Sequence, residues 1–304
     1  MPGRRGGWLS LKTGRYRSVT RHPETVRMKH VEANNVRDEE LDLLLDELFR
    51  TYGYDFTNYA RASLKRRVNR LMIIDRFPSF AELLYRLRQD PAYLPRIVEE
   101  LTVNVTEMFR DPTMFKTLRE QVLPVLATHP FIRIWHAGCA TGEEVYSMAI
   151  LLEEANLLHK SLLYATDLNP SAIENIRKGV FPLSEMKQYS ENYILSGGKN
   201  EFSKYYTAKY NWAKFDDRLK SKMIISTHNL VSDRSFNEFV LIFCRNVLIY
   251  FDRHLQDKVL DLFDESLEKL GFLVLGSKEN IRFSGIARKF KQLENKERIW
   301  RKVM

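Results

Sequence analysis

The sequence predicts a small all-α segment followed by an α/β domain built on a parallel sheet. Residues 37 to 101 repeat apolar side chains at helical spacing, and no strand-like alternation interrupts them. From residue 132 onward, short apolar runs alternate with amphipathic stretches, which is typical of a parallel sheet covered by helices. We therefore expect a doubly wound α/β fold for residues 102 to 304.

The composition indicates a globular, soluble protein. Its 304 residues are 44% hydrophobic and 12% aromatic, which is enough for a substantial core, and no apolar run reaches the roughly 18 residues of a membrane span. The two cysteines, Cys139 and Cys244, form no CxxC pair, so neither a disulfide framework nor a cysteine-based zinc site is supported. We expect a cytoplasmic protein without membrane insertion.

Residues 1 to 36 are predicted to be a basic, disordered tail. Residues 1 to 30 carry many arginines and lysines against one acid, Glu24, and hold no apolar core for a secretory signal. The alternative is an arm that touches an acidic surface. The formal net charge of +9 suits a nucleic-acid binder and equally a protein that meets acidic helices, so charge alone does not choose between them.

Within the helical segment, a helix is predicted around Asn58 to Met72. One stripe of it is apolar and the basic side chains lie away from that stripe. The apolar residues are Leu64, Val68, Leu71 and Met72, and the basic ones are Arg61, Lys65, Arg66 and Arg70. Residues 102 to 131 connect the two parts, and Asp111 followed by Pro112 predicts the start of a helix over residues 113 to 126.

Five apolar runs are predicted to be the strands of the sheet. They cover residues 132–139, 161–168, 223–230, 239–246 and 272–277. Residues 184 to 222 do not follow this alternation of apolar strands and helices. They hold the aromatic run from Lys204 to Trp212, and we expect an inserted β hairpin or three-stranded piece there.

The run from Ile132 to Glu144 is the strongest chemical feature: a buried strand leads into small residues and then into a helix that starts with two acids. Small residues let a ligand approach the backbone closely, but carboxylates at the helix start would repel a pyrophosphate. They suit a ligand with a cationic amino group or ribose hydroxyls. The simpler alternative is that Glu143 and Glu144 only stabilise the helix N-terminus.

Asp167 ends the next predicted strand, about 25 residues after the glycine turn, and Asn169-Pro170 then starts a helix. A carboxylate at this position can accept both ribose hydroxyls of a nucleoside. Alone it could equally cap the helix. The glycine turn and the acid together indicate a nucleoside site.

Five blocks in this order resemble the CheR family of chemotaxis receptor methyltransferases. They are residues 104–112, 137–144, 165–167, 228–230 and 243–252, and the resemblance extends over the helical segment with Tyr59 and residues 63–68. It implies a Rossmann-like class I S-adenosylmethionine-dependent methyltransferase domain with an inserted small antiparallel β subdomain, preceded by a small all-α domain. It also implies a last strand near residues 298–303 that runs antiparallel to the others.

The resemblance further implies the site residues and the cofactor, S-adenosylmethionine, with S-adenosylhomocysteine as product. The implied cofactor contacts are Asn104, Thr106, Arg110, Glu144, Asp167, Asn229, Leu230, Arg245 and Asn246, with Glu143 as a rival to Glu144. Arg110 and Tyr250 are implied to face the methyl group and the acceptor carboxylate. Two departures from the family's pattern are Met108, in place of the usual aromatic residue, and His136 before the glycine turn.

The implied reaction is methylation of glutamate side chains on the cytoplasmic helical domain of a transmembrane chemoreceptor. A glutamate with a pKa of about 4.3 is already ionised near neutral pH, so no general base is needed. We expect no metal, no nucleic acid and a monomer. The receptor is expected to dock on Arg61, Lys65, Arg66 and Arg70, and the β subdomain leaves open whether a receptor peptide is bound there.

Two other functions are compatible with parts of the sequence. A nucleic-acid methyltransferase fits the net charge, but the chain lacks both an Asp/Asn-Pro-Pro-aromatic motif and a Pro-Cys nucleophile, because Cys244 follows Phe243. A cofactor-binding regulator without catalysis is the second alternative. The intact set of Arg110, Asp167, Asn246 and Tyr250 argues against it.

Overall fold

The computed structural model describes residues 35–102, 104–293 and 296–304. These residues belong to one compact unit, Asn34–Met304. The predicted basic tail lies outside the described residues except for Asn35 and Val36. Val36 is buried, and its backbone N–H donates to the Asn69 side chain at 2.8 Å, so the ordered chain reaches back into the range predicted as tail.

The first part of the described chain is helical, as its apolar periodicity predicts. The helices are α1 Asp38–Tyr52, α2 Arg61–Ile74, α3 Phe80–Gln89, the 3-10 turn η1 Pro91–Tyr93 and α4 Leu94–Leu101. Gly53 ends α1 in the left-handed conformation, and the Ser79 hydroxyl caps α3. The predicted stripe of α2 is buried in a separate core. This helix begins at Arg61, three residues later than predicted.

The connecting segment starts its helix at Pro112, as predicted. It continues through a π-helical turn and ends before the first strand of the sheet: α5 Pro112–Thr117, η2 Leu118–Val122 and α6 Leu123–Ala127. Asp111 precedes Pro112 with φ of 57°, a left-handed value that is uncommon for a residue with a side chain.

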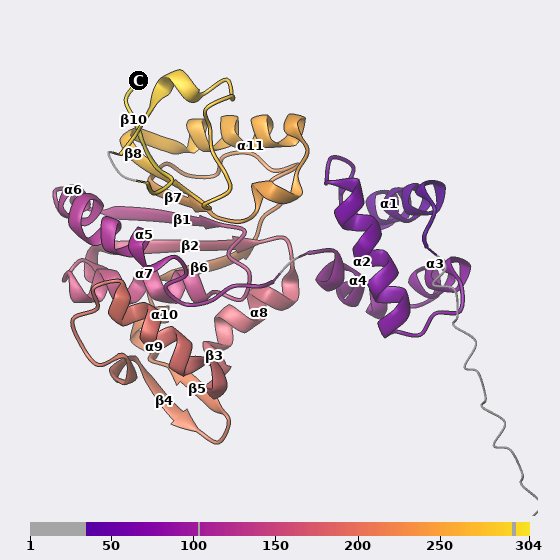
Figure 1. The fold of residues 1–304 in the computed structure, drawn as a ribbon, viewed down its shortest axis with the longest axis horizontal. Coiled ribbons are helices and arrows are strands. Elements are labelled where there is room, and N and C mark those ends of the chain that lie inside the picture. The colour runs from indigo at the N-terminus through magenta and orange to yellow at the C-terminus, as the bar shows by residue number, and fades with distance from the viewer. Residues whose placement is uncertain (1–34, 103, 294–295) are drawn as a thin grey trace, which may run out of the picture. The chain divides into compact units, whose positions relative to one another are not determined.

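The large sheet has the order β6-β2-β1-β7-β8-β10-β9 (Figure 1). The strands are β1 Ile132–Ala137, β2 Ser161–Asp167, β6 Met223–Thr227, β7 Phe239–Cys244, β8 Leu267–Leu275, β9 Phe290–Gln292 and β10 Ile299–Lys302. Strands β6, β2, β1, β7 and β8 are parallel, and β10 pairs antiparallel with β8 and β9. The antiparallel last strand is confirmed, whereas three-residue β9 was not predicted.

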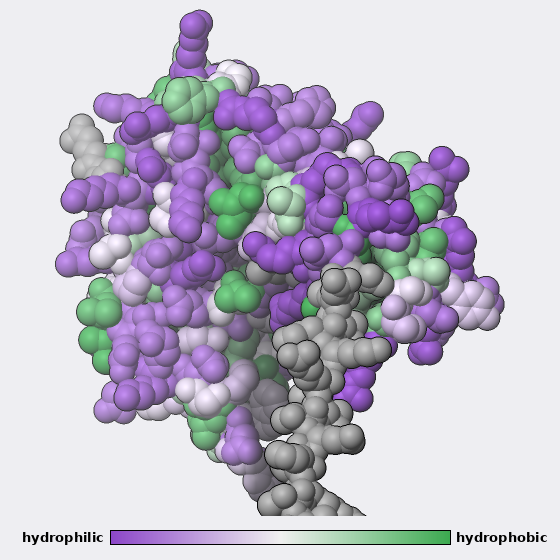
Figure 2. Space-filling view, turned by 45° about the vertical axis from the view of Figure 1, so that its right-hand side comes forward, coloured by the Kyte–Doolittle hydropathy of each residue, from purple (hydrophilic) through white to green (hydrophobic). Residues whose placement is uncertain are grey.

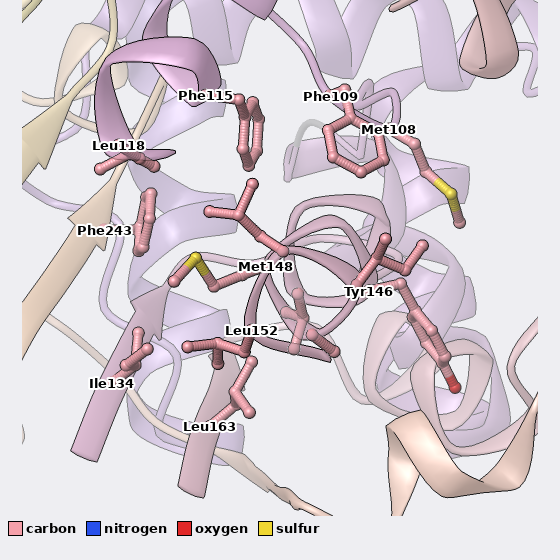
Figure 3. Packing of buried hydrophobic residues seen from close by; sticks show 14 of the residues in the cluster. Met108, Phe109, Phe115, Leu118, Ile134, Tyr146, Met148, Leu152, Leu163 and Phe243 are labelled. Atoms are coloured by element: carbon pink, nitrogen blue, oxygen red, sulfur yellow. The ribbon is translucent and has the colours of Figure 1, made fainter. Parts of the chain in front are cut away.

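Residues of alternating strand positions fill two cores on opposite faces of this sheet. On β1, Ile134 packs into one cluster and Trp135 into the other. The first face is covered by helices that include α7 Glu143–Glu154 and α8 Pro170–Lys178, and the second by α11 Arg253–Ser266. Met148 and Leu152 of α7 lie against strand residues Ile134 and Leu163 (Figure 3).

A second, three-stranded antiparallel sheet has the order β3-β5-β4. Its strands are β3 Val180–Pro182, β4 Tyr206–Lys209 and β5 Trp212–Phe215, and β4 and β5 form the predicted hairpin (Figure 1). The inserted piece differs from the prediction in two respects. Its sheet includes β3, which lies before residue 184, and the piece also contains a helix, α9 Met186–Leu195.

The remaining short elements connect these parts. They are η3 Leu158–Lys160, η4 Leu183–Glu185, η5 Phe202–Tyr205, α10 Asp217–Lys220, η6 Leu248–Tyr250 and η7 Ala287–Lys289. The parallel sheet with helices on both faces, the small antiparallel sheet and the preceding helical part confirm the predicted fold class.

The face drawn in Figure 2 is largely hydrophilic, and its hydrophobic side chains form small separate groups. Across the described part of the chain, no helix combines the length and the apolar character needed to span a bilayer.

Gly142 has a φ of 98°, and a Cβ atom there would lie 2.7 Å from Cγ1 of Ile176. We expect Gly142→Ala to lower the free energy of unfolding by about 2–4 kcal/mol, because strain and overlap both act at this turn. Urea denaturation measures the change. Gly285→Ala is the control, since a Cβ there meets no atom within 4 Å. Equal stability of the two variants would contradict the prediction.

Candidate active site

A cavity of about 370 Å³ opens at the carboxyl ends of the parallel strands. Its walls include Gly138 after β1, Asp167 at the end of β2, Asn229 after β6 and Asn246 after β7. Strand β1 lies between β2 and β7, so the strand order reverses there and the loops on either side diverge. Such a switch point is where open α/β sheets bind ligands, and the volume falls in the range of about 300–1,000 Å³ typical of small-molecule sites.

Apart from the rival Glu143, the site residues named in the sequence analysis line this one cavity. They are Asn104, Thr106, Arg110, Glu144, Asp167, Asn229, Leu230, Arg245, Asn246 and Tyr250. They come from segments far apart in the chain. Those that follow β1, β2, β6 and β7 meet because the carboxyl ends of parallel strands share one edge of the sheet, and Asn104, Thr106 and Arg110 come from the segment between α4 and α5. Their shared location makes a common ligand possible, and their individual contacts with it stay predictions.

Asp167 holds the glycine turn against the end of β2. Its Oδ2 accepts the backbone N–H of Ala140 at 2.8 Å, and its Oδ1 accepts that of Asn169 at 2.9 Å. Burial raises the pKa of Asp167, and these backbone donors oppose that rise. Each oxygen keeps a second lone pair, so the carboxylate can still accept hydroxyl groups from a ligand.

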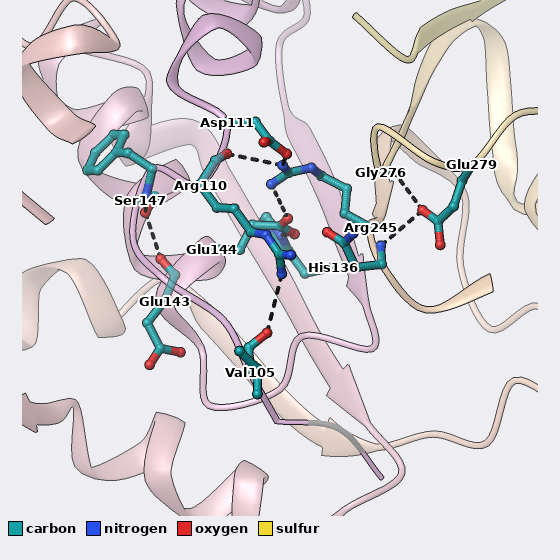
Figure 4. Close-up of polar contacts among 12 residues, drawn as sticks. Val105, Arg110, Asp111, His136, Glu143, Glu144, Ser147, Arg245, Gly276 and Glu279 are labelled. Carbon is teal, nitrogen blue, oxygen red and sulfur yellow. Dashed lines mark hydrogen bonds and ion pairs between the residues drawn. The ribbon is translucent and has the colours of Figure 1, made fainter. Parts of the chain in front are cut away.

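Arg245 is the buried cation of the site, and Figure 4 shows it between two carboxylates. Its guanidinium lies 2.5 Å from Asp111 Oδ2 and 3.1 Å from Glu144 Oε2, and it donates to the backbone oxygen of Arg110 at 3.0 Å. Glu144 Oε1 lies 2.9 Å from Nδ1 of His136. Burial would raise the pKa of Glu144, but His136 and Arg245 together hold it below its usual value.

Arg110 and Arg67 also line the cavity, and neither pairs with a carboxylate of the described residues. Arg110 donates to the backbone oxygen of Val105 at 3.3 Å. Arg67 of α2 donates to the backbone oxygen of Leu101 at 2.9 Å, and its guanidinium lies 4.9 Å from the ring centroid of Tyr250. Two such cations, half-buried at one cavity, suit an anionic ligand.

The loops that carry these residues are held in uncommon backbone conformations. Phe109, Asp111, Ala140 and Asn246 all have φ between 48° and 60°. Such values cost free energy for residues with a side chain and persist where the surrounding structure enforces them, often at functional sites. Phe109 and Asp111 flank Arg110, so this strain fixes the direction of its main chain.

The segment before α2 is joined to the loop after β7. The N–H of Ala60 donates to the oxygen of Tyr250 at 2.8 Å, the N–H of Asp252 donates to the oxygen of Asn58 at 2.9 Å, and Tyr59 forms a bridge with Phe251. Burial raises the pKa of Tyr59. These bonds bring Arg67 and Tyr250 to the same cavity.

Glu143 and Glu144 have different surroundings. Glu144 lines the cavity, whereas Glu143 is not among the lining residues and accepts the Thr141 hydroxyl at 2.7 Å. Burial raises the pKa of Glu143 to about 7, and bonds from Thr141 and Tyr189 limit the rise. The geometry thus favours Glu144 as the ligand-facing acid.

Sequence reasoning missed three contributors to this site: Arg67, His136 as a partner of Glu144, and Glu279. Glu279 is buried and accepts the N–H groups of Asn246 at 2.9 Å and Gly276 at 2.6 Å, which holds the loop after β7. Burial raises its pKa. Of these, Arg67 could have been found from its spacing. It lies three residues after Leu64 and four before Leu71, so on a helix it borders the apolar stripe that these two leucines form.

The ring of His228 packs edge-on against that of Trp135, with 5.2 Å between the ring centroids, and His228 also lines the cavity. Among the residues that the structure describes, no group of three or more His, Cys, Asp or Glu side chains could hold a metal ion.

A parallel sheet with a glycine turn after β1, an acid at the end of β2 and a cavity at the switch point is the arrangement of a nucleoside-binding enzyme, here an S-adenosylmethionine-dependent methyltransferase. The family model "CheR methyltransferase, SAM binding domain" matches residues 104–299, and "CheR methyltransferase, all-alpha domain" matches residues 39–102. The chain belongs to the CheR methyltransferase family.

Three relatives illustrate the similarity. A Pseudomonas putida protein named Cher3 is 45% identical over 267 residues, which are 87% of this chain and 97% of the relative. The chemotaxis protein methyltransferase of Listeria monocytogenes is 29% identical over 76% of this chain and 86% of its own. That of Salmonella typhimurium is 32% identical over 75% of this chain and 76% of its own.

The raised pKa of Glu143 makes stability depend on pH. Between its unfolded pKa, near 4.5, and about 7, the unfolded chain releases this proton while the folded protein keeps it, so rising pH favours unfolding. We expect Glu143→Gln to remove this loss, which amounts to about 2–3 kcal/mol between pH 5 and pH 8. Urea denaturation at both pH values measures it, with Glu39→Gln at an exposed site as control. Parallel stability profiles for wild type and Glu143→Gln would contradict it.

Proposed function

We propose that this protein transfers a methyl group from S-adenosylmethionine to glutamate side chains of a chemoreceptor. The observation that carries the proposal is the pairing of opposite charges in one cavity: the acids Asp167 and Glu144, at the end of β2 and the start of α7, and the guanidinium groups of Arg67 and Arg110, on α2 and in the loop before α5. The former suit the cofactor and the latter suit an acceptor carboxylate. The chemotaxis methyltransferases among the relatives support the receptor as substrate.

The residues around the glycine turn fit the cofactor. Gly138 has a φ of 70°, and a Cβ there would lie 2.6 Å from Cγ2 of Val247, so the backbone is kept bare at the cavity wall. Asp167 would accept the ribose hydroxyls, and Glu144 would attract the ammonium group. Asn246 Oδ1 is buried without a partner in the described structure, so it is available as an acceptor. When bound, S-adenosylmethionine supplies a methyl group on a positively charged sulfur.

The residues on the acceptor side hold and orient a carboxylate and need not move a proton. A glutamate side chain is ionised near neutral pH, so it requires placement and removal of water rather than a base. Arg110 would bind it through a charge-assisted hydrogen bond, and Tyr250 would confine it beside Arg67. An acceptor carboxylate that pairs too strongly with an arginine would be a weaker nucleophile. Arg110 already donates to the backbone oxygen of Val105 and Arg67 to that of Leu101, and these bonds limit how far either guanidinium can move towards the acceptor.

We propose that the helical receptor docks on α2, where the expected basic residues differ in their surroundings. Arg61 pairs with Asp42 at 2.6 Å, Lys65 with Asp38 at 2.9 Å and Arg70 with Glu100 at 3.4 Å. Arg66 is exposed and has no ion-pair partner within the described chain. Its charge is therefore the most available of the four to an acidic partner.

We also propose that the protein acts in the cytoplasm and as a monomer. The reduced, buried Cys139 and Cys244 fit a reducing compartment, and burial raises the pKa of both thiols, which keeps them unreactive.

The function is tested by transfer of radiolabelled methyl groups to membranes that carry chemoreceptors of the source organism. We expect label on the receptor that base treatment releases, because glutamyl methyl esters are base-labile. Asp167→Ala should abolish both transfer and S-adenosylhomocysteine binding in calorimetry, since the turn and the ribose lose the same carboxylate. Asp261→Ala, exposed on α11, is the control.

Label on RNA or DNA would overturn the receptor assignment in favour of a nucleic-acid methyltransferase. Cofactor binding without any transfer would favour a regulatory protein. Unchanged affinity of Asp167→Ala would refute its placement at the cofactor.

Docking is tested separately with Arg66→Glu. We expect it to raise KM for receptor membranes about fivefold at low ionic strength with kcat unchanged, and the difference should shrink towards ~0.5 M salt, where exposed charges are screened. Lys269→Glu, the same charge reversal at an exposed site near the start of β8, is the control. An equal change in both variants would mean that only net charge matters.

A further inference from the structure

We propose that His136 is a positioning residue that holds the carboxylate of Glu144 towards the cofactor side of the cavity. The inference rests on the proposed function and adds a residue of the β1 strand to the machinery of that site. His136 stands on β1, two residues before Gly138 of the glycine turn.

The surroundings of His136 point to a single polar task. The side chain is fully buried, and its ring stacks on Phe243 with centroids 4.6 Å apart and planes 7° from parallel. Nδ1 lies 2.9 Å from Glu144 Oε1, and Nε2 has no partner within the described structure. A carboxylate only accepts hydrogen bonds, so Nδ1 carries the proton and donates.

Packing alone would not place a histidine here. A phenylalanine ring could stack on Phe243 without burying an unpaired Nε2, and an unpaired buried polar atom costs about 1–3 kcal/mol. The polar function that offsets this cost is the bond to Glu144.

Glu144 needs a second donor because its other partner is shared. The guanidinium of Arg245 contacts Glu144 at 3.1 Å but also Asp111 at 2.5 Å. Without His136, the carboxylate would be free to turn both oxygens towards Arg245, a geometry that guanidinium groups favour. The bond from Nδ1 keeps the two oxygens on separate donors and prevents this turn.

The effect extends to the acceptor side. Arg245 also donates to the backbone oxygen of Arg110 at 3.0 Å. His136, Glu144, Arg245 and the Arg110 main chain thus form one chain of hydrogen bonds, and Figure 4 shows its members side by side. If the carboxylate of Glu144 moves, the guanidinium group of Arg245 shifts with it, and the hydrogen bond from Arg245 to the main chain of Arg110 changes.

Two substitutions separate this role from packing. His136→Phe keeps the stacked ring and removes the donor, whereas His136→Asn places an amide N–H where Nδ1 stands and removes the ring. We expect His136→Phe to weaken S-adenosylhomocysteine binding about tenfold in calorimetry, the factor that corresponds to a lost hydrogen bond to a charged group. His136→Asn should bind within about threefold of wild type, despite its lower stability. His159→Phe, at an exposed histidine, should change nothing.

A third variant tests whether the effect passes through Glu144. In a Glu144→Ala background, His136→Phe should add no further loss of affinity, because the acceptor of the Nδ1 hydrogen bond is already gone. Additive losses would overturn the inference. So would wild-type affinity in a folded His136→Phe protein, or equal losses in the Phe and Asn variants.

Calorimetry with S-adenosylhomocysteine requires no acceptor, so these results do not depend on the receptor assignment. If the wild-type protein binds the cofactor product but methylates no receptor, the proposed function fails, while the role of His136 is still decided by the affinities. If the wild-type protein does not bind S-adenosylhomocysteine, the inference fails with the cofactor assignment.

Discussion

The site depends on one buried positive charge. Arg245 leaves the end of β7 in a place from which water is almost excluded, and a lone guanidinium there would be strongly unfavourable. Asp111 and Glu144 stabilise it, and these two acids come from the loop before α5 and from the first turn of α7. Three segments that are distant in the chain must therefore meet before any of them is stable. Removing Arg245 would leave the buried Glu144 without its guanidinium partner, and breaking a buried ion pair in this way typically costs about 3–5 kcal/mol.

Around this charge, buried acids fix the main chain. Asp167 holds the glycine turn and Glu279 holds the loop after β7, each by accepting backbone N–H groups. The left-handed conformations of Ala140 and Asn246 lie in the same two loops. Backbone strain and buried carboxylates thus occur together, because the bonds to the carboxylates offset the cost of the strain. The result is a set of loops whose shape is determined before a ligand arrives.

Local patterns in the sequence predicted most of the fold. The strands were found because β1, β2 and β7 are short and mostly apolar. The glycine turn was found because small residues follow the first of these runs and acids follow the small residues. Strands β3 and β9 were missed because three residues carry no periodicity, and α9 was missed because its apolar residues show little helical periodicity. The cavity-lining residues were named through the resemblance. What escaped prediction were pairings across the chain, such as that of Arg245 with Glu144, because spacing along a sequence does not reveal which charges meet.

The same limit applies to the basic helix. The pattern of α2 predicts correctly which side chains avoid the core, but it does not reveal that Arg61 and Lys65 already meet acids of α1. An exposed cation can already be paired with an acid of the same protein, and only the folded structure shows which exposed cations are unpaired.

The backbone bonds between residues 58–60 and 250–252 limit how this protein can be recombined with its relatives. A helical segment exchanged for that of another family member would also bring its own partner for the loop that carries Tyr250. The helical segment and the shape of this cavity loop are therefore inherited together at this junction. A chimera must therefore carry matching sequences on both sides of the Tyr59–Phe251 bridge, or the loop with Tyr250 will be displaced.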